Sequence, residues 1–192
     1  MHGFGKVRLA WTQCVIPAVV LCGCMVATAE VPALWLDVPY VKQSPEGCGA
    51  ASIAMVMQYW SAANGKAAGE RADPEYILRS LHSPEGRGIY ASVMSHYLQE
   101  QGYQTFSFAG DWDLLQQHLR KGRPLIIALK PGARESSLHY VVVAGMDSQR
   151  QILMVNDPAE RKLRELDRAT FEKQWEGAQR WTLLALPKQP GR

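Results

Sequence analysis

The stretch that most constrains the fold of this chain runs from Gln43 to Trp60, QSPEGCGAASIAMVMQYW. A turn of Pro45, Glu46 and Gly47 leads into an apolar run that begins at Ala50 and contains no Gly, Pro or charged residue. Because apolar side chains occupy more than one face of this run, it predicts a helix that is buried nearly all round. The rest of the chain therefore has to pack around this helix.

Cys48 enters this predicted helix in its first turn. The free N–H groups and the positive end of the helix dipole favour thiolate over thiol, so this position lowers the pKa of a cysteine. A reactive nucleophile is one interpretation. The alternative is a small buried side chain that only fills space near a helix end.

The first 29 residues have the three parts of a secretory signal peptide. Lys6 and Arg8 form a positive n-region, residues 14–26 form an apolar h-region, and Ala27-Thr28-Ala29 is a small-x-small cleavage pattern. The apolar run is shorter than the about 20 residues that a bilayer span requires. We therefore expect a signal peptide over 1–29, no membrane span, and export of the protein to the periplasm or beyond the cell.

An overlapping motif leaves a second route to the cell envelope open. Leu21-Cys22-Gly23-Cys24 resembles a bacterial lipoprotein cleavage box, in which Cys24 would carry a lipid. Soluble export is the first expectation, and a lipid-anchored envelope protein with an incidental thiol is the alternative. Cleavage after Ala29 leaves Cys48 as the sole thiol, so no internal disulfide can form. A lone thiol in an oxidising compartment favours the reactive interpretation of Cys48.

The composition indicates one globular domain and argues against a nucleic-acid-binding protein. The chain has 192 residues, of which 47% are hydrophobic and 20% charged. Its formal net charge is +3, but without Lys6 and Arg8 the remainder has 19 basic residues against 18 acidic ones. No basic stripe with interleaved aromatic residues is present. We expect residues 30–192 to form a single domain.

Helical patterns dominate the first part of this domain and strand patterns the second. The helices are predicted over 74–81, 90–101, 111–121 and 167–175, and the strands over 103–108, 124–130, 138–145, 151–156 and 181–186. Residues 36–41 are predicted to be a short entry strand or an extended segment. Residues 61–73 and 83–88 are predicted to be a loop and a turn. Helices first and strands afterwards predict an α+β fold with an antiparallel sheet.

A thiol nucleophile needs an imidazole base, and His139 is the best candidate because it begins a buried strand. His82 lies at a loop edge beside Ser83-Pro84. His96 and His118, on polar helix faces, are expected to be solvated. A hairpin turn centred near residue 148 places Asp157 opposite His139, where a carboxylate would orient the ring.

Other interpretations of this region stay open. A slip of one residue in the hairpin would place Asn156 beside His139 instead of Asp157. His139 could also be a strand-end residue satisfied by a backbone carbonyl. A tetrahedral intermediate further needs hydrogen-bond donors, for which the Cys48 backbone N–H and the Gln43 side chain are candidates.

These residues, taken in order, resemble the papain-like cysteine peptidases. The matching motifs are Gln43, Glu46-Gly47-Cys48-Gly49-Ala50, the His139–Gly145 strand and Asn156-Asp157-Pro158. They are most similar to the double-glycine leader (bacteriocin-processing) peptidases found at the front of bacteriocin-exporting ABC transporters, and to free-standing relatives of these. The resemblance covers residues 35–187. It implies a papain-like fold with a Cys-bearing buried helix packed on an antiparallel β-sheet.

The resemblance also implies a role for each candidate residue. Cys48 would be the nucleophile, His139 the general base and acid, Asp157 the group that orients His139, and Gln43 an oxyanion donor. We expect a monomeric thiol-dependent hydrolase that cleaves a peptide or protein substrate without a metal or cofactor. The alternatives are an inactive relative that binds peptides and an acyl transferase that uses the same residues.

Overall fold

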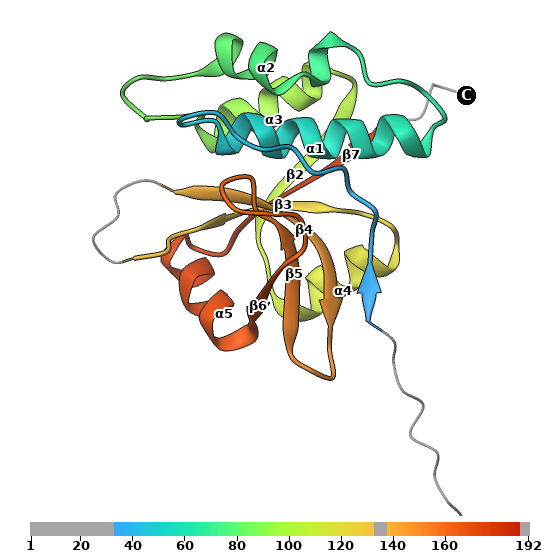
Figure 1. Cartoon of the computed structure of the whole chain (residues 1–192), viewed down its shortest axis with the longest axis vertical. Coiled ribbons are helices and arrows are strands. Elements are labelled where there is room, and N and C mark those ends of the chain that lie inside the picture. Colours follow the sequence, from blue (N-terminus) through green and yellow to red (C-terminus); the bar gives the residue numbers. More distant parts are fainter. Residues whose placement is uncertain (1–32, 133–137, 189–192) are drawn as a thin grey trace, which may run out of the picture. The chain divides into compact units, whose positions relative to one another are not determined.

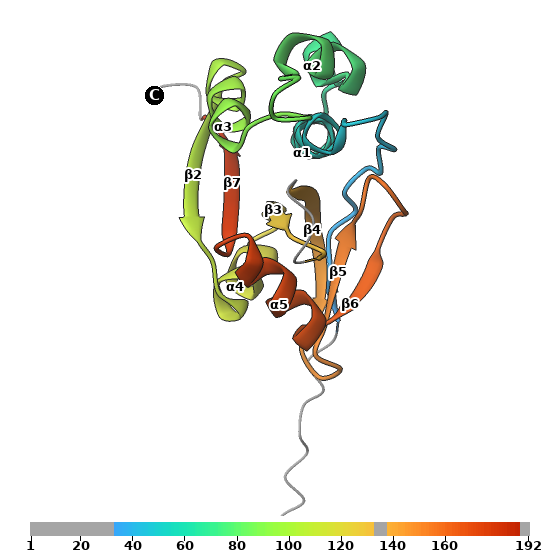
Figure 2. The same cartoon turned by 90° about the vertical axis from the view of Figure 1, so that its left-hand side faces the viewer.

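The sequence forms three layers, with an antiparallel sheet between two groups of helices (Figures 1 and 2). The structure is a computed structural model, and it describes residues 33–132 and 138–188. The signal peptide predicted over 1–29 and the alternative lipid site at Cys24 lie outside the described residues, so both stay predictions.

Within the described residues, seven strands form a single sheet in which every pair is antiparallel. Their order is β2-β7-β3-β4-β5-β6, and β1 pairs with β4. The strands are β1 (Leu34–Trp35), β2 (Tyr103–Ala109), β3 (Leu125–Leu129), β4 (His139–Asp147), β5 (Ile152–Asn156), β6 (Arg164–Asp167) and β7 (Trp181–Pro187).

One group of helices covers each face of the sheet. The helices are α1 (Cys48–Ala63), α2 (Pro74–Leu81), α3 (Ala91–Glu100), α4 (Trp112–Arg120) and α5 (Arg168–Gly177), with a short 3₁₀ turn at Glu70–Ala72. Figure 1 shows α1, α2 and α3 on one side of the sheet and α4 and α5 on the other. Across the described ranges, no helix combines the length and the apolar character needed to span a bilayer.

Alternate residues of the central strands face opposite helical layers. On β4, Tyr140, Val142 and Ala144 belong to the core beneath α1, whereas Val141 and Val143 belong to the core beneath α4 and α5. Burial on both faces explains why this strand has an unbroken apolar sequence, since neither face has to be polar.

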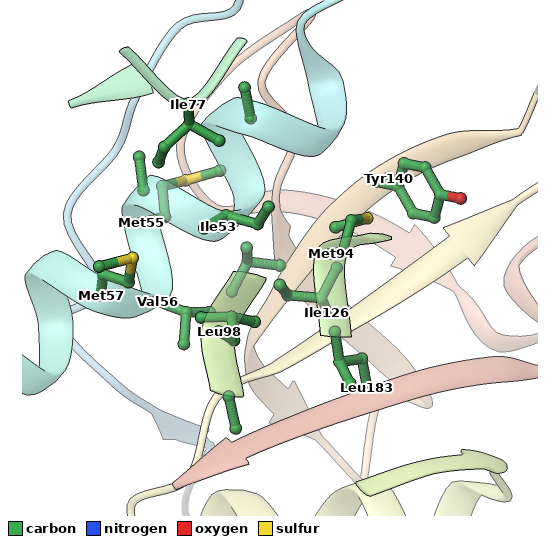
Figure 3. Packing of buried hydrophobic residues seen from close by; sticks show 14 of the residues in the cluster. Ile53, Met55, Val56, Met57, Ile77, Met94, Leu98, Ile126, Tyr140 and Leu183 are labelled. Atoms are coloured by element: carbon green, nitrogen blue, oxygen red, sulfur yellow. The ribbon is translucent and has the colours of Figure 1, made fainter. Parts of the chain in front are cut away.

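Helix α1 is the centre of the first core, as its sequence predicts. Its residues from Gly49 to Met57 are all buried, against strands on one side and against α2 and α3 on the other. Figure 3 shows this packing. The labelled side chains are Ile53, Met55, Val56 and Met57 of α1, Ile77 of α2, Met94 and Leu98 of α3, and Ile126, Tyr140 and Leu183 of the sheet.

The four later helices also lie where the sequence predicts them, each within about two residues at its ends. Three of them begin after an aspartate that caps the helix. The side chains of Asp73, Asp111 and Asp167 each accept a hydrogen bond from a backbone N–H of the first turn, at 2.8 to 2.9 Å. The predicted α+β class with an antiparallel sheet is confirmed.

Residues 36–41, which the sequence predicts to be a short strand or an extended segment, lie outside every strand. The first strand is instead Leu34–Trp35, because the chain leaves β4 after Leu36 and Pro39 has no N–H with which to continue a ladder. Strand β6 was not predicted at all. Its four residues, Arg-Glu-Leu-Asp, contain a single apolar side chain, so they show no alternation that would reveal an edge strand.

Asn156 fastens the extended segment that follows β1 to the sheet. This side chain is fully buried at the end of β5, donates a hydrogen bond to the carbonyl of Val38 at 3.0 Å and accepts one from the N–H of Leu163 at 3.0 Å. It therefore joins three separate parts of the chain.

We predict that Asn156→Ala lowers the free energy of unfolding by about 1–3 kcal/mol, because the buried Val38 carbonyl loses its partner. Urea denaturation measures this as a lower midpoint with an unchanged slope. Asn64→Ala is the control, since Asn64 makes an exposed hydrogen bond to Trp60, and it should change stability by less than about 0.5 kcal/mol. Equal losses in both variants would contradict the role given to Asn156.

Candidate active site

Cys48 is the first residue of α1 and is half-buried. The loop before it is held in place from both ends, since the N–H of Gln43 donates to the carbonyl of Pro158 at 3.0 Å and that of Gly47 donates to Ser44 at 2.9 Å. A Cβ on Gly47 would lie 2.9 Å from the Ser44 carbonyl oxygen, so only glycine fits at this turn. The loop therefore fixes where the thiol enters the helix.

His139 and Asp157 form the second part of the site. His139 is the first residue of β4, and its Nε2 lies 2.7 Å from Oδ1 of Asp157, which follows β5. Asp157 is only 1% exposed. Because Nε2 is used by the carboxylate, Nδ1 is the ring nitrogen that remains for Cys48, and the thiol and the imidazole shift each other's pKa.

The structure brings all four predicted site residues to one pocket. Gln43, Cys48, His139 and Asp157 line a cavity of about 360 Å³, together with Glu46 and Arg87. Residues up to 114 positions apart in the sequence (Gln43 to Asp157) therefore surround a common space that is large enough for part of a peptide.

The hairpin register that led to Asp157 was wrong by two residues. Strand β5 pairs Val155 with Val143 and Asn156 with Val142, with a bulge beyond Val143, so Asp157 lies past the last pair. In this register His139 and Asp157 are diagonal neighbours and not direct partners. They still share a face, because a shift of two residues, unlike a shift of one, preserves the alternation of side chains.

Asn156, the alternative to Asp157, is not beside His139. Its side chain points to the opposite face of the sheet, where it binds Val38 and Leu163. The structure also excludes the alternative in which a backbone carbonyl satisfies His139, since its Nε2 binds a carboxylate.

Electrostatics favour an ion pair between the thiol and the imidazole. Burial raises the pKa of Cys48, but hydrogen bonds to His139 and to the backbone at Tyr140 outweigh it, so the pKa falls below its ordinary value. Burial lowers the pKa of His139, but its bonds to Asp157 and Cys48 raise that pKa to about 9. A low thiol pKa beside a high imidazole pKa stabilises thiolate and imidazolium near neutral pH.

Arg164 also contacts this site, although no pattern in the sequence predicted it. Its Nη1 lies 2.7 Å from Oδ2 of Asp157 and 3.1 Å from Oε1 of Glu160. Burial raises the pKa of Asp157, but hydrogen bonds from His139 and Arg164 hold it below its ordinary range. Arg164 lies on β6, and since that strand was not predicted, its position next to Asp157 could not be predicted either.

Gln43 offers an amide to the same pocket. Among the described residues, none donates a hydrogen bond to its buried Oε1 atom. The NH₂ group of this amide can donate a hydrogen bond. Because Gln43 and Cys48 line the same pocket, Gln43 is a candidate donor to an oxyanion that forms there.

Of the histidines in the described residues, His82, His96 and His118 do not line this pocket. His96 is exposed and pairs with Glu100, as expected for a solvated residue, and His82 pairs with Glu46. The prediction that His118 is solvated was wrong. Its ring packs 6.1 Å from that of Phe108, its Nδ1 is buried, and burial lowers its pKa.

A Cys-bearing buried helix packed on an antiparallel sheet that supplies histidine and aspartate defines a papain-like cysteine peptidase. The chain belongs to the Peptidase_C39 like family, whose family model matches residues 35–182. The predicted resemblance and the papain-like fold are thereby confirmed, and the protein is a cysteine peptidase. No curated protein matches its sequence.

Several solved structures share the fold. One is a Bacillus anthracis protein described as a C39-like peptidase, at 17% identity and a TM-score of 0.62 over 83% of this chain and 100% of that one. Another is the peptidase domain of Streptococcus ComA, a bifunctional ABC transporter involved in quorum sensing. It has 23% sequence identity and a TM-score of 0.60, and the match covers 79% of this chain and 99% of that one. The third is xylellain, a cysteine protease of Xylella fastidiosa. It has 13% sequence identity and a TM-score of 0.52, and the match covers 84% of this chain and 88% of that one.

We predict that Arg164→Gln lowers the free energy of unfolding at pH 7 by about 1–3 kcal/mol, because one oxygen of the buried Asp157 carboxylate loses its cation. A group with a depressed pKa stabilises the fold above its unfolded pKa of about 3.9 and loses that contribution as the pH falls through its folded pKa. The difference from the unchanged protein should therefore shrink below about pH 4.

Denaturation midpoints at a series of pH values measure this difference. Arg161→Gln is the matched control, since Arg161 is an exposed residue near Arg164, and should differ little from the unchanged protein. A loss in Arg164→Gln that does not depend on pH would contradict the ion pair.

Proposed function

We propose that this cysteine peptidase cleaves peptide bonds with Cys48 as nucleophile, His139 as general base and acid, Asp157 as the orienting group and Gln43 as an oxyanion donor. The observation that carries the proposal is the hydrogen-bonded series in which Asp157 holds one nitrogen of His139 at 2.7 Å and leaves the other for Cys48. This arrangement lines the pocket of about 360 Å³.

The geometry suggests the following sequence of steps. The Cys48 thiolate attacks the peptide carbonyl carbon, and the oxyanion that forms accepts hydrogen bonds from the Cys48 backbone N–H and the Gln43 amide. The His139 imidazolium gives its Nδ1 proton to the leaving amine, which produces a thioester. His139 then takes a proton from water, which attacks the thioester and releases the acid and the thiolate.

Asp157 supports these steps without exchanging a proton. Its hydrogen bond keeps a proton on Nε2 of His139 and so directs Nδ1 towards Cys48. Its negative charge stabilises the imidazolium that the thiolate requires. Arg164, in turn, holds the carboxylate itself in place.

We further propose that the protein acts outside the cytoplasm. The support is the predicted export signal over residues 1–29, with its basic start, apolar centre and Ala27-Thr28-Ala29 site. The mass of the mature N-terminus after expression of the full chain in a bacterial host would give Glu30 for soluble export and a lipid on Cys24 for an anchored form.

We predict that Cys48→Ser abolishes hydrolysis of labelled casein and that Gln43→Ala lowers kcat by about 10²–10³, because the oxyanion loses a donor that acts mainly in the transition state. KM should change little in the Gln43 variant. His96→Ala is the control and should keep full activity, since His96 is exposed and binds only Glu100.

Two outcomes would count against this proposal. Hydrolysis that survives in Cys48→Ser would mean that another group or a contaminant acts. With an added primary amine, products that carry the amine in place of a free carboxylate would show that acyl transfer, and not hydrolysis, is the reaction.

A further inference from the structure

Two charged residues beside Cys48 adopt a backbone conformation that normally belongs to glycine. Glu46 has φ +58° and Arg87 has φ +48°. This left-handed region costs free energy in any residue with a Cβ, and glycine avoids the cost. Glycine occurs directly beside both residues, at Gly47, Gly86 and Gly88. Strain of this kind persists where the side chains are needed.

The side chains of these two residues bind each other. Oε1 of Glu46 lies 3.2 Å from Nε of Arg87, and Oε2 of Glu46 lies 2.8 Å from Nε2 of His82. We call Glu46, His82 and Arg87 the clasp. Each oxygen of one carboxylate therefore holds a different basic side chain.

The clasp joins two loops that are 36 to 41 residues apart in the sequence. Glu46 belongs to the loop that carries Cys48 into α1. His82 and Arg87 flank and occupy a tight turn, in which the backbones of Ser83 and Gly88 exchange hydrogen bonds at 2.8 and 3.2 Å. The Glu46 side chain, on the Cys48 loop, therefore contacts the side chains of His82 and Arg87 at the Ser83–Gly88 turn.

This turn forms one wall of a groove that passes over the thiol. A second cavity of about 350 Å³ is lined by residues 85–90, by Tyr140 and by Cys48. Cys48, Arg87 and Leu138 line both this cavity and the first one. The two cavities therefore meet at the thiol, and Arg87 lies at their junction.

We propose that the clasp holds the Ser83–Gly88 turn as a fixed wall of the peptide groove, with Glu46 and Arg87 as positioning residues for extended substrates. The inference rests on the proposed function, because it specifies what holds a peptide at the Cys48 thiol. The clasp touches neither His139 nor Asp157 by any hydrogen bond within the described residues. The reactivity of the thiol and the binding of a peptide should therefore respond differently when the clasp is removed.

Glycine substitutions distinguish two roles for Glu46 and Arg87, which either only form turns or also hold the clasp together. Glu46→Gly and Arg87→Gly both remove the side chain and relieve the left-handed strain. If the two residues only form turns, the variants should be at least as stable and as active as the unchanged protein. If they form the clasp, peptide binding should weaken although Tm does not fall.

Two reagents that attack Cys48 measure the difference. Iodoacetamide is small and needs no groove, whereas a peptidyl epoxide has to lie in the groove to react. We expect both variants to react with the epoxide about two- to fivefold more slowly than the unchanged protein, the range expected when largely exposed ion pairs are lost. Their iodoacetamide rates and Tm should stay close to those of the unchanged protein.

Gln151→Gly is the matched control. Gln151 also has a left-handed φ, of +53°, but it lies in the turn between β4 and β5 and lines neither groove cavity. It should react like the unchanged protein with both reagents. Arg87→Gly is the second test of the clasp, because Arg87 is distant in sequence from the nucleophile and its loss leaves the Cys48 loop intact.

The proposal is overturned if the clasp variants react with the epoxide at the full rate of the unchanged protein. It is equally overturned if their rates with the epoxide and with iodoacetamide fall by the same factor, because that would mean that the Cys48 loop itself has moved. It is also overturned if the unchanged protein shows no preference for the peptidyl epoxide while its thiol reacts at acidic pH. A thiol without reactivity at acidic pH in the unchanged protein would instead contradict the proposed catalytic residues.

Discussion

The burial of the Asp157 carboxylate is the constraint on which the rest of the site depends. A charge that is 1% exposed needs partners on both oxygens, because an unpaired buried charge is strongly destabilising. Oδ1 binds His139 and Oδ2 binds Arg164. These partners come from β4 and β6, the two strands on either side of β5, whose end carries Asp157. The order of strands in the sheet therefore determines which groups can meet the carboxylate, and through it the orientation of the imidazole.

The layer above the sheet positions the other half of the site. Helix α1 is buried on all sides over most of its length and packs directly on β4, so Cys48 at its first residue has little freedom to move relative to His139 at the start of that strand. A rigid helix and a rigid strand hold the reacting groups more firmly than loops would. The loop before the helix is tied down separately, to Pro158 through Gln43 and to the Ser83–Gly88 turn through Glu46.

The sequence alone revealed the parts of this site that follow from local patterns. The all-round apolar run marked α1, the continuous apolar strand marked His139, and alternation placed Asp157 on the correct face even though the register was off by two residues. The missing parts depend on long-range packing. Arg164 lies on a four-residue edge strand with no apolar period, and Glu46 and Arg87 meet only because two distant loops fold together. A single sequence contains no local signal for either contact.

Catalysis by this site would depend most directly on a thiolate at Cys48 that His139 stabilises. The measurement that tests it is the rate of iodoacetamide alkylation of Cys48 as a function of pH, in the unchanged protein and in His139→Ala. An ordinary thiol loses reactivity below its pKa of about 8.5. The account predicts that the unchanged protein still reacts fast near pH 5, and that the His139 variant follows the curve of an ordinary thiol. If both proteins follow that same ordinary curve, no thiolate–imidazolium pair exists and the account is wrong.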